Sequence, residues 1–152
     1  MAEYNDEKSM MRDALQEMIE VARYCIEFEK NKDSRWIGDE GCYGFPGALL
    51  LLSIVDALGT IIVSGSTANH FKILNHRDYY DLNLSNKEID ALYKDYRCRL
   101  SHNARISKFV VMHPGNDKIS VLEYYNDGRL QLNLFPFLYL SEKVIKNFLS
   151  KQ

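Results

Sequence analysis

The stretch PGALLLLSIVDALGTIIVSG, residues 46 to 65, is a long and almost continuous apolar segment. Proline suits the first turn of a helix and glycine suits its stop, so the stretch predicts a helix that ends at about Ser64. A membrane span has a similar length, but Ser53, Asp56 and Thr60 interrupt the interior and leave only short apolar runs. We therefore interpret the stretch as the central helix of a soluble helical bundle.

Apolar residues at helical spacing predict helices on both sides of this stretch. Before it, the apolar positions from Met11 to Cys25 recur every three or four residues, which indicates an amphipathic helix over roughly residues 6–30. After it, Ser66 or Thr67 can cap a short further helix. These elements belong to one bundle.

A later helix is indicated by its capping sequence. Ser85 and Glu88 form the S-x-x-E pattern of a capping box, in which each side chain binds the other residue's backbone N–H. Apolar residues on one face continue from there, and the helix should end near Ser101 or His102.

Beyond this helix the hydrophobic period changes to two. Residues 119–124 and 130–134 alternate between apolar and polar side chains, and the turn sequence Asn-Asp-Gly lies between them at 126–128. This pattern predicts an antiparallel β-hairpin. Residues 108–112 are candidates for a third strand.

We expect Pro136 to end the hairpin and a closing helix to run over about residues 141–149. The chain contains no internal repeat or linker, so residues 1–152 should form a single domain. Its helical core would cover about residues 8–105, and the hairpin and final helix about residues 107–150. The predicted fold class is mainly α: a helical bundle with a C-terminal antiparallel hairpin and a closing helix (α+β).

Bulk composition limits the possible partners. The net charge of −2 produces no general attraction for polyanions, so any contact with RNA must come from a local basic patch.

The N-terminus is acidic and lacks an apolar signal core. Three scattered cysteines indicate reduced thiols rather than a disulfide framework; they are Cys25, Cys42 and Cys98. We expect a cytoplasmic protein without a membrane segment.

No cofactor or metal is expected from the sequence. His70, His76 and Asp78 do not have the spacing of a metal site. The chain also lacks the glycine-rich loops that bind nucleotide phosphates.

Asp56 is the one carboxylate on the apolar central helix. A buried carboxylate needs a partner, because an unpaired one costs several kcal/mol or becomes protonated. Arg97 and Arg99 flank the apolar face of the capped helix and are the expected partners. Two interpretations stay open: a purely structural ion pair, or an aspartate that orients an arginine for work on a substrate.

The end of the capped helix, YKDYRCRLSHNARI at residues 93–106, is unusually basic. Cationic side chains at a helix C-terminus already interact favourably with the helix dipole, which is the simpler interpretation. Arg97 and His102 are five residues apart, which places them about 140° apart on a straight α-helix. They would form one site only if the helix unwinds at Ser101 or if a second subunit completes it.

Arg97 and His102, with Asn103 following, fit the R-x4-H motif of HEPN-domain proteins, and the helix LLLLSIVDALG also resembles bacterial members of that family. The resemblance covers roughly residues 8–105. It implies a four-helix up-and-down bundle that forms a homodimer. Many members are metal-independent endoribonucleases, including toxins paired with a nucleotidyltransferase-like antitoxin, and others only bind RNA or nucleotides.

Carried over residue by residue, the resemblance assigns catalysis to Arg97 and His102. A histidine can transfer protons to and from the RNA, and an arginine can stabilise charge on the phosphate. The further candidates are an orienting Asp56 and four substrate-binding residues, Arg99, Ser101, Asn103 and Arg105. The leading hypothesis is a HEPN-type endoribonuclease acting in a toxin or defence system. The alternative is a noncatalytic module that binds nucleotide, RNA or a protein partner.

Overall fold

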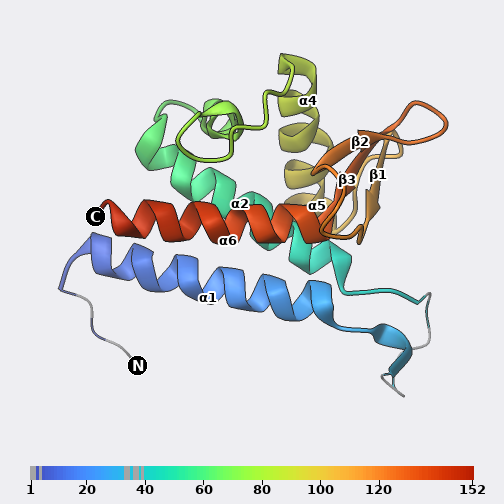
Figure 1. Cartoon of the computed structure of the whole chain (residues 1–152), viewed down its shortest axis with the longest axis horizontal. Helices are drawn as coiled ribbons and strands as arrows, with labels where there is room; N and C mark the ends of the chain where they lie inside the picture. The colour runs from blue at the N-terminus through green and yellow to red at the C-terminus, as the bar shows by residue number, and fades with distance from the viewer. Residues whose placement is uncertain (1–2, 4, 33–34, 36–37, 39) are drawn as a thin grey trace.

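The computed structural model describes residues 3, 5–32, 35, 38 and 40–152. The fold is mainly helical, with a small three-stranded mixed sheet and a C-terminal helix (Figure 1). The long helices α1 and α6 lie side by side, α2 passes behind α6, and the sheet lies at one end of these helices.

Three long helices build the core. They are α1 (Glu7–Glu27), α2 (Gly44–Ile62) and α6 (Leu134–Ser150), and each packs against the other two. A short 3₁₀ turn, η1 (Lys30–Lys32), follows α1. The side chain of Asp6 caps α1 by accepting a hydrogen bond from the backbone N–H of Ser9 at 2.7 Å. All three helices contribute fully buried apolar side chains, including Leu15, Leu51, Leu58, Phe137 and Leu138.

The expected central helix is confirmed as α2. By length and hydropathy α2 is the one described helix that could cross a membrane. It packs instead against α1, α3, η2, η3 and α6, as a core helix of a soluble protein does. Its exposed apolar side chains are few, with Phe45 and Ile61 at opposite ends. The structure is therefore not clearly that of a membrane protein.

A short helix packs directly on the end of α2. It consists of α3 (Thr67–His70), capped by Ser66 as expected, and the 3₁₀ turn η2 (Phe71–Asn75). The contact is unusually close, because a Cβ atom on Gly59 would lie 2.3 Å from the carbonyl oxygen of His70. Glycine at this position allows the backbone of His70 to reach the surface of α2.

The capped helix is a composite of three segments. They are α4 (Asn86–Ala91), the π-helical segment η3 (Leu92–Cys98) and α5 (Arg99–Asn103). The predicted capping box is present, with Ser85 and Glu88 in both roles. Figure 1 shows this helix crossing α6 rather than running parallel to it. The composite helix continues to Asn103, so it does not unwind at Ser101.

The sheet contains β1 (Val110–His113), β2 (Leu122–Tyr124) and β3 (Leu130–Asn133) in the order β1-β3-β2. β2 and β3 form the predicted antiparallel hairpin. The candidate third strand is present as β1, but it pairs in parallel with β3, so the sheet is mixed rather than wholly antiparallel.

The closing helix begins earlier than its sequence indicates. We expected the hairpin to end at Pro136 and the closing helix to begin at about residue 141. Instead, α6 starts at Leu134, directly after β3. Pro136 lies in the first turn, where the backbone N–H groups have no partner within the helix, so proline is tolerated there. The early start places Phe137 and Leu138 in the core beside α1 and α2.

Candidate functional site

An ion pair between Asp56 and Arg97 joins the central helix α2 to the composite helix. Arg97 is one of the two arginines that we expected as a partner of Asp56. Oδ2 of Asp56 lies 3.1 Å from Nη2 of Arg97. The two side chains are only 18% and 25% exposed, so solvent screens the pair incompletely. The other candidate, Arg99, is exposed on the outer side of α5.

His70 is a second partner of Asp56 that the sequence did not indicate. Its Nδ1 atom lies 2.7 Å from Oδ1 of Asp56, and its side chain is 10% exposed. The signal that could have revealed it is Gly59 in the interior of α2, since a missing side chain there allows a neighbouring backbone to approach. Which residue approaches could not be read from the sequence.

Both ring nitrogens of His70 face hydrogen-bond acceptors. Nε2 lies 2.9 Å from the carbonyl oxygen of Gly65. Nδ1 faces the Asp56 carboxylate and lies 3.3 Å from Oγ1 of Thr60, whose own proton is donated to the Asp56 carbonyl. The ring is therefore held in place by polar atoms on both sides. Asp56 lies between Arg97 and His70 and contacts both of them.

Only part of the Arg97 guanidinium group binds Asp56. Its Nη2 atom binds the carboxylate, and its Nε atom is buried without a hydrogen-bond partner among the described residues. The Arg97 side chain as a whole is 25% exposed, so part of it is open to solvent. Tyr93 lies on the same π-helical segment as Arg97 and packs edge-on against Phe71, with 5.4 Å between the ring centroids. A hydrogen bond with Cys98 raises the pKa of the Tyr93 hydroxyl.

His102, Ser101 and Asn103 are all exposed on α5. The Ser101 hydroxyl donates to the carbonyl of Cys98 at 3.3 Å. In the part of the chain that the structure describes, no hydrogen bond links His102 to Arg97. The helix is unbroken between them, so unwinding at Ser101 does not bring these two residues together.

Arg99 and Arg105, two of the predicted substrate-binding residues, line the same groove. Its volume is about 340 Å³, and Ile106, Ser107, Lys108 and Phe109 complete the lining. Ala104 brings the two arginines together, because its left-handed backbone (φ 53°, ψ 29°) turns the chain back at the end of α5. Lys108 and Phe109 are groove residues that the sequence interpretation missed.

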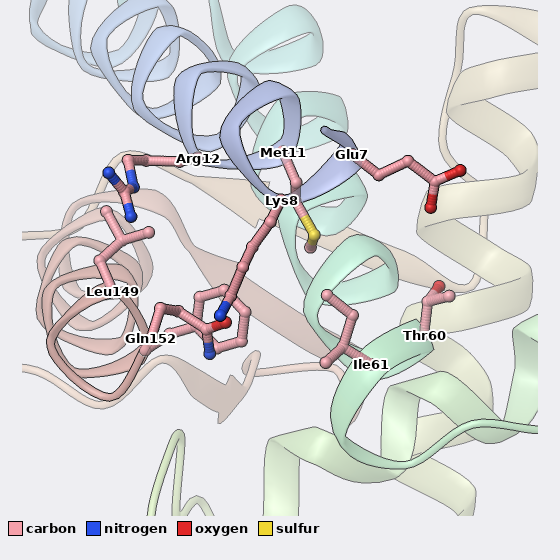
Figure 2. A pocket seen from close by; sticks show the side chains of 9 residues that line it. Glu7, Lys8, Met11, Arg12, Thr60, Ile61, Leu149 and Gln152 are labelled. Atoms are coloured by element: carbon pink, nitrogen blue, oxygen red, sulfur yellow. The ribbon is translucent and has the colours of Figure 1, made fainter. Parts of the chain in front are cut away.

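A separate cavity of about 410 Å³ lies where α1 begins and where α2 and α6 end (Figure 2). Its floor is apolar, with Met11, Ile61 and Leu149 among the lining residues. Figure 2 shows Lys8 extending across the cavity toward Gln152. None of the predicted site residues lines this cavity, so its size alone does not make it the candidate site.

Within the described ranges, no three His, Cys, Asp or Glu side chains are close enough to hold a metal ion. Comparison with known proteins gives no match among protein-family models, curated proteins or solved structures.

Proposed function

We propose that this protein is a HEPN-type RNA-binding protein that cleaves RNA without a metal ion. The observation that carries the proposal is the arrangement along the composite helix. Asp56 binds Arg97, whose side chain is 25% exposed, and His102 is exposed five residues further on, in the order of the R-x4-H motif. An arginine in this state can bind a phosphate, and an exposed histidine can transfer a proton.

The proposed site is shared between two copies of the chain. Arg97 and His102 lie on different faces of an unbroken helix, so each would work with its counterpart from a second copy across a two-fold axis. Two histidines then serve two proton transfers. One removes the proton of the 2′-hydroxyl, the bond from that oxygen to phosphorus forms as the bond to the 5′-oxygen breaks, and the other protonates the departing 5′-oxygen.

The experiment is a chelator-resistant cleavage assay on labelled single-stranded RNAs. Replacing His102 with alanine should reduce cleavage about 10²- to 10⁴-fold, and Arg97→Ala should reduce it about 10²- to 10³-fold. His113→Ala is the matched control, because this exposed histidine lies at the end of β1. Full activity in His102→Ala would exclude the mechanism.

Light scattering on the same samples tests the shared site. We expect a dimer at micromolar concentration, with or without RNA. A strictly monomeric protein that nevertheless cleaves RNA would rule out a site completed by a second copy.

A noncatalytic binding module is the second candidate function. The observation that favours it is the commitment of Arg97 to Asp56, with Nε buried and only part of the guanidinium accessible. RNA binding by wild-type protein without any cleavage would support this candidate. Under either function, we propose that the protein is cytoplasmic. If it is a nuclease, we propose that it acts as a toxin or in defence, with a nucleotidyltransferase-like antitoxin as its partner.

A further inference from the structure

The groove between the end of α5 and the start of β1 combines positive charge with an exposed aromatic ring. Arg99, Arg105 and Lys108 supply three cations to its lining, which contains no acidic side chain. Across the described part of the chain, none of these cations takes part in an ion pair. In a protein with a net charge of −2, this is a local concentration of uncompensated positive charge.

Phe109 gives the groove its second property. The side chain is 66% exposed, so a large apolar surface is left in water. Lys108 Nζ lies over the ring, 5.2 Å from its centroid. A cation over an exposed aromatic face marks a surface that also accepts the flat face of a nucleobase.

The backbone around Phe109 is held by hydrogen bonds although the residue is largely exposed. The N–H of Phe109 donates to the Ser107 hydroxyl oxygen at 3.3 Å, and the N–H of Ser107 donates to the carbonyl of Asp95 at 2.9 Å. β1 begins at the next residue and pairs with β3. The ring is therefore presented by an ordered loop, which lowers the entropy cost of stacking on it.

We propose that this groove binds one nucleotide of a single-stranded RNA, with the base stacked on Phe109 and a phosphate between Arg99 and Arg105. Lys108 would move from the ring as the base arrives and join the phosphate contacts. The volume of about 340 Å³ lies within the range of small-ligand sites. The inference rests on the proposed function only for the choice of RNA, since it requires no cleavage.

The test measures binding of a fluorescein-labelled 2′-O-methyl oligouridine by fluorescence anisotropy. This probe has no free 2′-hydroxyl and cannot be cleaved, so the result is independent of catalysis. Phe109→Leu should weaken binding roughly 5- to 100-fold, the typical effect of losing one stacked base. Phe109→Tyr should bind like the wild type. Phe45→Leu, the same change at a residue that is 49% exposed on α2, should have no effect.

The charge contacts are tested by salt dependence. Arg105→Gln should reduce the slope of log K against log salt by about 0.7, the value for one phosphate contact on a single strand. Phe109→Leu should leave this slope unchanged. Lys146→Gln removes one exposed charge on α6, away from the groove lining, and should change neither slope nor affinity.

The possible outcomes separate this inference from the proposed nuclease. Cleavage of RNA with equal affinities for Phe109→Leu and Phe45→Leu would overturn the groove assignment and leave the nuclease standing. Binding with the expected pattern but no cleavage would support the groove and count against the nuclease. A wild-type protein that does not bind the probe would overturn the groove assignment.

Discussion

Asp56 and Arg97 lie 41 residues apart in the sequence, yet Oδ2 of one approaches Nη2 of the other to 3.1 Å. The same carboxylate holds His70 with its second oxygen at 2.7 Å. One side chain on α2 therefore connects α3 and the π-helical segment. Asp56 therefore links three elements of the fold and also positions Arg97 in the candidate site.

Replacing Asp56 with alanine should destabilise the protein by about 3 kcal/mol, because the mostly shielded Arg97 would lose its counter-charge and His70 would lose a polar partner. Urea denaturation measures this free energy of unfolding. Asp90→Ala is the control, since the Asp90 and Lys94 pair is exposed and should cost less than about 1 kcal/mol. Equal effects of the two substitutions would show that shielding at Asp56 has no energetic importance.

Gly59→Ala should destabilise the protein by about 1–3 kcal/mol, despite alanine's better helix propensity, because the new Cβ would overlap the backbone of His70. Gly44→Ala is a suitable comparison on the same helix. Its Cβ would meet the terminal methyl of Met112 at 3.0 Å, and a flexible side chain can move away. Thermal unfolding should show a clear drop in Tm for the first variant and a small change for the second.

Ala104→Gly should stabilise the protein by up to about 1 kcal/mol. Alanine at φ 53° carries the steric cost of the left-handed region, which glycine avoids. Ala14→Gly on the exposed face of α1 should instead cost about 1 kcal/mol. Opposite shifts of Tm in the two variants would support this assignment, and a loss of stability in both would contradict it.

Tyr96→Phe tests the connection between the composite helix and the sheet. The Tyr96 hydroxyl donates to the carbonyl of Val111 at 2.6 Å, and losing this bond should cost about 1–2 kcal/mol. Burial raises the pKa of Tyr96 above its usual value. The neutral hydroxyl therefore stabilises the fold fully below about pH 10, and this contribution is lost as pH rises from there.

The alkaline range provides the check on this assignment. In urea denaturation, the stability difference between wild type and Tyr96→Phe should narrow from pH 8 to pH 10.5. A constant difference would mean that the Tyr96 hydroxyl ionises as easily in the folded protein as in the unfolded chain.

Local signals allowed several elements to be predicted from the sequence. Ser85 and Glu88 carry the complete chemistry of a capping box within four residues, and Asn-Asp-Gly at 126–128 specifies a hairpin turn. The need of Asp56 for a cation follows from its apolar surroundings. These inferences succeeded because their physical causes lie within a few residues.

The features that were missed depend on distant parts of the chain. The parallel pairing of β1 with β3 depends on tertiary placement rather than on strand patterning. The π-helical segment differs from an α-helix only in its hydrogen-bond spacing, which leaves no clear mark in the sequence. His70 became a partner of Asp56 only through the close approach at Gly59, and Phe109 became part of a groove only through the turn at Ala104.

The strand order β1-β3-β2 also has a consequence for the sequence of events during folding. The β2–β3 hairpin closes a short local loop, so it can form within about 1–10 μs. β1 pairs with β3, and β2 lies between these two strands in the sequence. Pairing of β1 therefore closes a longer loop, at a greater entropic cost. The strand pairing next to Phe109 therefore carries a larger loop-closure entropy than the neighbouring hairpin does.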